Sequence, residues 1–180
     1  MSVKVIYLAG VPACGKTTMF KRIRMELFEG VAKEFKHGLC RGIESNNGAF
    51  SMLGVFDGST FEGTDRLSMA VINDAMDYVS KLRDDTAKHV VFVEGDRLFN
   101  HRFVSGTGAE LIIMDANEEV LNARHRMRGN TQNERFLRSR RSKVENFIKA
   151  HGCIRVYNNN DTDAYRIFNY IISAATSFVK

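Results

Sequence analysis

The sequence predicts an α/β fold, in which a mostly parallel sheet is flanked by helices on both faces. Three observations predict it. Apolar, strand-like runs alternate with segments of helical periodicity along the whole chain. The first run, residues 3–8, leads directly into a glycine-containing loop and a helix over residues 18–28. Two further apolar runs, 88–93 and 110–114, are followed by acidic residues, which is typical of buried parallel strands with functional carboxyl ends.

The loop after the first run carries the pattern G-x-x-x-x-G-K-[ST], with Gly10, Gly15, Lys16 and Thr17 at its fixed positions. Glycines let the backbone wrap closely, so that N–H groups and the positive end of the next helix point at a polyphosphate. We predict that Lys16 reaches the outer phosphates and that the Thr17 hydroxyl holds Mg²⁺. The predicted nucleotide-binding residues are Gly10, Val11, Pro12, Ala13, Cys14, Gly15, Lys16, Thr17 and Thr18. The alternative, a glycine-rich turn before an ordinary helix, is disfavoured by the flanking strand and helix.

The next segments are a weak strand over 35–43, a polar Asn-Gly turn over 44–48 suited to a hairpin, and a better strand over 49–56. That strand leads into a glycine-punctuated loop, residues 57–66. Loops at the carboxyl ends of parallel strands form the ligand crevice, so this loop is expected beside the phosphate loop. A helix over 66–82, capped by Thr64 or Asp65, should follow.

The apolar run 88–93 ends at Glu94, with Asp96 two residues beyond it. A buried strand ending in a carboxylate is the layout that holds Mg²⁺ in phosphoryl-transfer proteins. We therefore predict Glu94 as a metal ligand together with Thr17, with Asp96 as its competitor. The alternative for Asp96 is a helix N-cap with no role toward a metal.

The remaining elements are a short amphipathic piece over 98–103, a turn over 105–108, and a strand over 110–114. Two basic helices are expected over 118–128 and 133–150, then a strand over 153–157 and a helix ending near residue 178. The polar turn between the last two elements begins with Asn158 and Asn159. These two residues either border the nucleotide base or form an ordinary asparagine-rich turn.

The net charge of +5 is concentrated in one segment. Residues 122–143 contain eight Lys or Arg and one acid, a local +7 that leaves the rest of the chain at −2. Such a cluster indicates a phosphate-binding site, so we predict a lid over about 118–150. Arg124 is expected to bind the nucleotide, while Arg128 and Arg135 neutralise the transferred phosphoryl group. Arg135, Arg138 and Arg141 should share a helix face. A solvated basic helix is the alternative.

Length and composition bound the remaining possibilities. A chain of 180 residues with 44% hydrophobic content is expected to form one domain, residues 1–180. No apolar run approaches the length of a membrane span, and three scattered cysteines argue against a disulfide framework or a zinc cluster. We expect a soluble, cytoplasmic protein without a membrane partner.

Two stretches carry a family resemblance: FDGSTFEGTDRLSM at 56–69 and FVEGDRL at 92–98. With the phosphate loop and the arginine-rich segment, they resemble the bacteriophage 5-hydroxymethyluracil DNA kinases, in the nucleoside and nucleotide kinase branch of the P-loop proteins. No N-K-x-D segment of the GTPase branch is present. The resemblance covers most of the chain and is strongest over 7–98. It implies a P-loop kinase fold and, with Mg²⁺, transfer of the γ-phosphate of ATP or GTP to the base hydroxymethyl group in DNA. It also implies a cytoplasmic location, which is the host cytoplasm if the protein is phage-encoded.

A primary alcohol is a poor nucleophile, so such a kinase needs a carboxylate to take the proton. We predict Asp57 as this base, with turn capping as its alternative role. The acceptor site is predicted to contain Glu62, Thr64, Asp65, Arg66 and Arg97, with Arg66 on a DNA phosphate. Because the hydroxymethyl group lies at the major-groove edge of a stacked base, we expect the base to be flipped out or the DNA to be locally opened, with the basic segment holding the backbone. Two competing hypotheses are a kinase of a free nucleoside, nucleotide or other small alcohol, and a nucleotide-switched binding protein.

Overall fold

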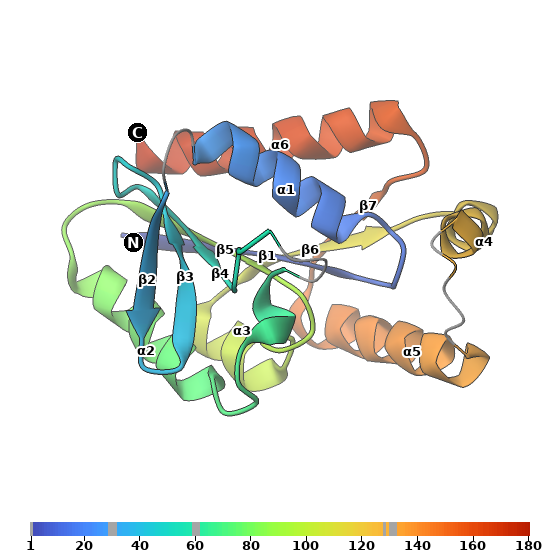
Figure 1. The fold of residues 1–180 in the computed structure, drawn as a ribbon, viewed down its shortest axis with the longest axis horizontal. Coiled ribbons are helices and arrows are strands. Elements are labelled where there is room, and N and C mark those ends of the chain that lie inside the picture. The colour runs from blue at the N-terminus through green and yellow to red at the C-terminus, as the bar shows by residue number, and fades with distance from the viewer. Residues whose placement is uncertain (1, 29–31, 59–61, 128, 130–132) are drawn as a thin grey trace.

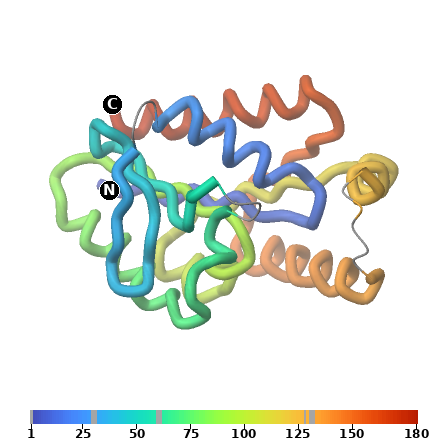
Figure 2. The backbone as a smooth tube through the Cα atoms, viewed as in Figure 1, coloured from blue at the N-terminus to red at the C-terminus, as the bar shows by residue number. Residues whose placement is uncertain are grey.

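A computed structural model describes residues 2–28, 32–58, 62–127, 129 and 133–180. A central sheet of seven strands lies between two layers of helices (Figure 1). The tube in Figure 2 shows the N-terminal strand running through the middle of the molecule and the C-terminal helix crossing one face of the sheet.

The strand order is β2-β3-β4-β5-β1-β6-β7. The strands are β1 (Val3–Gly10), β2 (Lys33–His37), β3 (Cys40–Glu44), β4 (Phe50–Leu53), β5 (His89–Glu94), β6 (Glu110–Asp115) and β7 (Ile154–Tyr157). Strands β4, β5, β1, β6 and β7 are parallel, whereas β3 pairs antiparallel with both β2 and β4. The chain leaves β1 toward the β4 side and later crosses to β6 on the other side. Ligands bind at such a reversal, outside the carboxyl ends of the strands.

The helices divide into two layers (Figure 1). One face of the sheet is covered by α1 (Lys16–Leu27) and α6 (Asp161–Val179), and the other by α2 (Ile72–Asp84), α3 (His101–Thr107) and α5 (Glu134–His151). Helix α4 (Glu118–Met127) lies beyond the carboxyl end of β6. Alternate residues of β1 enter the two cores: Ile6 and Leu8 pack on the α1 side, Val5 and Tyr7 on the α2 side. Burial on both faces explains why the central strands are apolar throughout.

The predicted α/β class and the parallel central strands are confirmed. The expected strand over 35–43 is wrong, because the chain reverses at Gly38 (φ +57°) and forms a hairpin of β2 and β3. The Asn-Gly turn is confirmed: Gly48 (φ +69°) lies between the antiparallel strands β3 and β4. Among the described helices, none combines the length and apolarity needed to cross a bilayer.

Two helix boundaries differ from expectation. The helix predicted over 66–82 begins only at Ile72, because Leu67 is extended after a short 3-10 turn, Thr64–Arg66. The expected short piece over 98–103 and turn over 105–108 are replaced by one helix, α3 (His101–Thr107), with Asn100 accepting a hydrogen bond from the N–H of Phe103. Local turns and capping residues, rather than the spacing of apolar residues, thus determine where these two helices begin.

The strand predicted over 49–56 ends at Leu53. Gly54 (φ +137°) turns the chain, and Val55 then forms an isolated antiparallel bridge with Gly63. Asp57 therefore lies in the loop beyond this bridge, four positions after the end of β4. Its predicted place directly at a strand end is wrong.

Candidate functional site

The loop between β1 and α1 is shaped by close backbone approach. A Cβ atom at Gly10 would overlap the carbonyl oxygen of Met114 in β6, and one at Gly15 would overlap the Asn158 side chain. Ala13 also has a positive φ, +66°. The Asn158 amide donates to the carbonyl of Cys14 at 2.9 Å. The two motif glycines are thus required by the packing of this loop against β6 and the segment after β7.

Helix α1 begins at Lys16 with an N-terminus that no side chain caps and no acidic residue in its first turn. Unclaimed N–H groups and the positive helix dipole make this end an anion site. The ammonium of Lys16 donates to the carbonyls of Gly10 (3.0 Å) and Val11 (2.9 Å). The Lys16 side chain therefore folds back over its own loop. A bound polyphosphate would compete with these carbonyls for the hydrogen bonds that Lys16 donates.

The predicted metal ligands come together at the ends of α1 and β5. The Thr17 hydroxyl donates to a Glu94 carboxylate oxygen at 3.3 Å. Glu94 is only 6% exposed, and this burial raises its pKa to about 7, although Lys16 acts in the opposite direction. A hydroxyl and one carboxylate beside a phosphate site fit Mg²⁺, which takes few protein ligands and binds substrate phosphates. Among the described residues no cluster of three or more metal-binding side chains was found, which such a site does not require.

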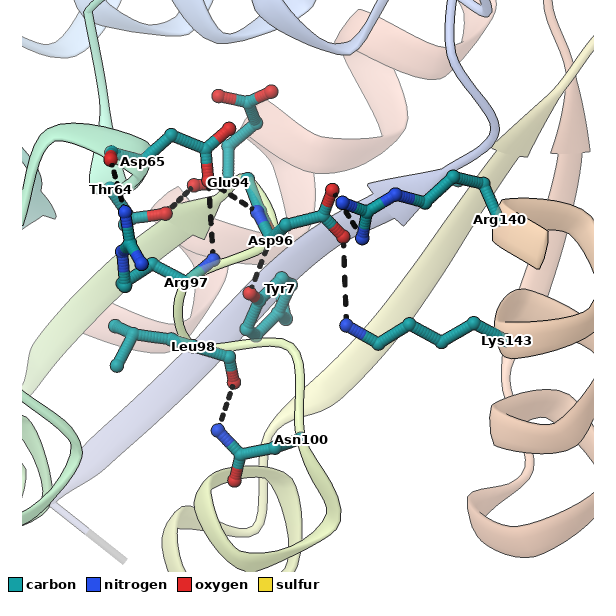
Figure 3. A network of polar contacts seen from close by, with 12 residues as sticks. Tyr7, Thr64, Asp65, Glu94, Asp96, Arg97, Leu98, Asn100, Arg140 and Lys143 are labelled. Atoms are coloured by element: carbon teal, nitrogen blue, oxygen red, sulfur yellow. Dashed lines mark hydrogen bonds and ion pairs between the residues drawn. The ribbon is translucent and has the colours of Figure 1, made fainter. Parts of the chain in front are cut away.

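The backbone after Glu94 is fixed by a polar network (Figure 3). Tyr7 donates to the carbonyl of Gly95 at 2.8 Å, and Thr64 donates to the carbonyl of Glu94 at 2.5 Å. The carboxylate of Asp65 accepts from the N–H groups of Asp96 (2.7 Å) and Arg97 (3.2 Å). This network joins the 64–66 turn to the end of β5.

Arg97 completes the junction. Its guanidinium donates to the carbonyl of Asp65 at 2.8 Å and also contacts the sulfur of Met69. Thr64 is fully buried. Three of the predicted acceptor-site residues, Thr64, Asp65 and Arg97, thus contact one another or the end of β5 in this structure. Their predicted contact with the acceptor stays a prediction.

A pocket reaches Thr17 and Glu94 from the side of α1. It is lined by Thr17, Phe20, Lys21, Arg24, Met52, Phe56, Glu62, Gly63 and Glu94. Glu62 forms an ion pair with Arg24 at 3.4 Å and accepts from the N–H of Gly58 at 2.7 Å. The sequence reading missed Arg24. It lies seven positions after Thr17 and therefore on the same face of α1, so this spacing could have identified Arg24 from the sequence.

Asp57 and Arg66 form an ion pair at 2.5 Å, with 45% of the Asp57 side chain and 37% of the Arg66 side chain exposed. Asp57 is not among the residues that line the Thr17 pocket, whereas Glu62 from the same loop is. Two carboxylates of this loop are therefore candidates for proton transfer.

The predicted lid contributes cations in a different pattern from the expected one. In α5, Arg140 (2.8 Å) and Lys143 (3.7 Å) pair with Asp96, just after β5 (Figure 3). Arg135 and Arg141 are exposed, and Arg138 pairs with Glu134 on its own helix at 2.8 Å. The face of α5 that contacts the end of β5 thus contains Arg140 and Lys143 rather than the predicted Arg135, Arg138 and Arg141.

Two other lid predictions have different outcomes. Arg124 of α4 donates to the carbonyl of Ala13 at 3.4 Å, which brings it to the phosphate loop. Arg128 lies outside the described residues. Asn159 accepts from the N–H of Asn117 at 2.7 Å, and its predicted contact with the nucleotide base, like that of Asn158, stays a prediction.

Comparison with known proteins identifies a family and solved structures of similar fold. The model of the family described as P-loop Nucleotide Kinase3 matches residues 1–169. A solved structure described as an unliganded sugar kinase from Janibacter sp. HTCC2649 is similar over 97% of both chains, with a TM-score of 0.52 and 12% identity. At this identity the likeness concerns the fold alone. No curated protein matches this chain.

Proposed function

The chain belongs to the P-loop Nucleotide Kinase3 family, and from this membership we propose that it transfers the terminal phosphoryl group of a nucleoside triphosphate to an alcohol. The observation that carries the proposal is the Thr17–Glu94 contact beside an uncapped helix N-terminus. In this proposal Thr17 and Glu94 would bind a divalent cation next to the polyphosphate, the combination that phosphoryl transfer needs.

The residues of the phosphate loop have distinct roles in this proposal. The N–H groups at the start of α1 bind the phosphate oxygens, and Lys16 exchanges its bonds to the Gly10 and Val11 carbonyls for bonds to the outer phosphates. Thr17 and Glu94 would hold Mg²⁺, which neutralises charge on the triphosphate when bound. Arg124, which donates to the carbonyl of Ala13 in this loop, would contact the nucleotide.

We propose the hydroxymethyl group of 5-hydroxymethyluracil in DNA as the acceptor, with ATP as the donor. The support is the resemblance over residues 56–69 and 92–98, the two stretches that the Asp65 and Arg97 contacts join. Asp57 is the proposed base, held by Arg66, and the target base would be flipped out of the duplex. Exposed cations of α5, Arg135 among them, would contact the DNA backbone or the transferred group.

A free nucleoside, nucleotide or other small alcohol is the second candidate acceptor. The observation that favours it is the lining of the Thr17 pocket, where Phe20 and Phe56 lie beside the Arg24–Glu62 ion pair. Such walls suit one small ligand rather than a polymer.

One labelling experiment tests both candidates. The protein is incubated with Mg²⁺ and γ-labelled ATP, and with DNA containing 5-hydroxymethyluracil, the same DNA containing thymine, or free 5-hydroxymethyl-2′-deoxyuridine. Label entering only the modified DNA supports the DNA proposal, and label entering only the free nucleoside selects the second candidate. A protein that binds no Mg²⁺–nucleotide complex would overturn the kinase proposal itself.

A further inference from the structure

A second hollow lies beside the Thr17 pocket, between the β2–β3 hairpin and the segment that follows β4. It has a volume of about 330 Å³ and is lined by Glu34, Phe35, Lys36, Arg41, Gly42, Ile43, Gly54, Val55 and Phe56. This volume is within the range of small-molecule sites. We call it the hairpin groove.

The hairpin groove is on the α1 side of the sheet. Phe35 stacks on Tyr78 of α2, with ring centroids 4.5 Å apart, so the side chains next to Phe35 on β2 point to the opposite face. Ile43 belongs to the core cluster that α1 covers. Lys36 and Arg41 therefore project over the same face as the phosphate loop and its helix.

Lys36 and Arg41 are directly opposite each other in the β2–β3 register. Like charges at opposed positions destabilise a strand pair, and here both are exposed residues lining one hollow. No ion pair is recorded for either cation within the part of the chain that the structure describes. Glu34 also lines the groove but faces Ile43, so the cationic pair has no acid directly across from it. An anion bound between the two cations would relieve their repulsion.

The hairpin groove and the Thr17 pocket share one lining side chain. Phe56 lines both the hairpin groove and the pocket that contains Thr17, Glu62 and Glu94. One molecule extending past Phe56 would thus have one end near the triphosphate and the other between Lys36 and Arg41.

We propose that the hairpin groove binds a phosphate group of the acceptor substrate, with Lys36 and Arg41 as its ligands. This inference rests on the proposed function, because it presumes that an acceptor reaches the Thr17 pocket. The phosphate is either a phosphodiester next to the target base in DNA or the 5′-phosphate of a free nucleotide. Both present the anionic oxygens that paired Lys and Arg side chains bind.

The test is equilibrium binding to the full chain without turnover. The double variant Lys36→Gln/Arg41→Gln is compared with Lys33→Gln, which removes a cation from the same strand at a position outside the groove lining. The probes are a DNA oligomer containing 5-hydroxymethyluracil, 5-hydroxymethyl-2′-deoxyuridine 5′-monophosphate and the uncharged nucleoside. Thermal unfolding of each variant verifies that it is folded.

The double variant is expected to bind at least one phosphate-bearing probe about tenfold more weakly, while nucleoside and ATP binding stay unchanged. Weaker DNA binding, with a smaller dependence of the affinity on salt concentration, identifies the phosphodiester as the bound group. Weaker binding of the monophosphate identifies the 5′-phosphate. Unchanged binding of both phosphate probes, failure of the unmodified protein to bind either, or an equal loss in the Lys33 variant overturns the inference. Because binding is measured apart from transfer, intact phosphate binding without labelled product would count against the proposed kinase function alone.

Discussion

The hydroxyl of Thr17 and the carboxylate of Glu94 are in hydrogen-bond contact at 3.3 Å, although they are 77 positions apart in the chain. The contact arises because β1 and β5 are adjacent parallel strands, with Leu8 opposite Glu94. The helix that follows β1 thus begins beside the last residue of β5. A substitution of either residue therefore alters the same region, between the start of α1 and the end of β5.

Replacement of Lys16 by Ala should lower the rate of phosphoryl transfer by roughly 10²- to 10³-fold, because a positive charge on the outer phosphates is lost. The fold should survive, since the hydrogen bonds of Lys16 among the described residues go to Gly10, Val11 and Cys14 of its own loop. Transfer of label from γ-labelled ATP measures the effect. Arg22→Ala, an exposed cation on the same helix, is the control. Normal turnover by Lys16→Ala would contradict the assigned role.

Glu94→Gln should stabilise the metal-free protein at alkaline pH while abolishing Mg²⁺-dependent transfer. Burial raises the folded-state pKa of Glu94 from 4.5 to about 7, so the folded state holds its proton more tightly than the unfolded chain does. The free energy of unfolding therefore falls as pH rises from about 4.5 to 7, by at most about 3 kcal/mol. Glutamine does not titrate and avoids this loss.

Urea unfolding in the presence of a chelator tests this at pH 5 and pH 8. The stability advantage of Glu94→Gln over the unmodified protein should be larger at pH 8. Asp115→Asn, at the end of the other strand beside β1, serves as a comparison. An advantage for Glu94→Gln that does not change with pH would show that folding does not raise the pKa of Glu94.

Asp57→Asn and Glu62→Gln together identify the group that takes the acceptor proton. If Asp57 is the base, its variant should lose kcat by about 10²- to 10⁴-fold, because the amide cannot accept the proton. Glu62→Gln should then chiefly alter KM for the acceptor through the lost ion pair with Arg24. Steady-state kinetics with the modified DNA or the nucleoside distinguishes the two. The reverse pattern would transfer the role of base to Glu62.

His89 is expected to make the protein sensitive to mild acid. It is 5% exposed and contacts the hydroxyl of Ser51 at 2.5 Å, and burial lowers its pKa below the usual 6.5. The unfolded chain thus binds a proton at a higher pH than the folded one does, and stability is lost as pH falls below about 6.5. His89→Gln should flatten the dependence of the denaturation midpoint on pH between 7.5 and 5.5. An equally steep dependence in this variant would exclude His89 as its source.

Asp96 is expected to hold the N-terminal half of α5 against the end of β5. Asp96→Asn removes the charge that pairs with Arg140 and Lys143, so amide exchange in residues 134–143 should accelerate. The loss of overall stability should stay below about 1 kcal/mol because all three groups are partly exposed. Glu134→Gln, which breaks the exposed pair with Arg138, should change exchange less. Equal exchange in both variants would argue against this anchoring role.

Sequence reasoning succeeded where the information is local. The phosphate loop is a run of consecutive residues whose backbone conformation demands glycines, and the apolar strand before it and the helix after it are encoded next to it. The end of β5 at Glu94 follows from an apolar run that stops at a carboxylate. From these patterns the α/β class and the pairing of Thr17 with Glu94 could be predicted.

The tertiary structure decided the features that depend on how distant segments pack. Whether residues 33–44 form one strand or a hairpin depends on the turn at Gly38 and on packing against Tyr78. The bridge between Val55 and Gly63 sets the path of the loop after β4, in which Glu62 but not Asp57 lines the Thr17 pocket. The α5 cations that meet Asp96 likewise depend on how α5 is rotated against the sheet. The spacing of residues along the chain determines which side chains share a face, but the packing of neighbouring elements determines what that face contacts.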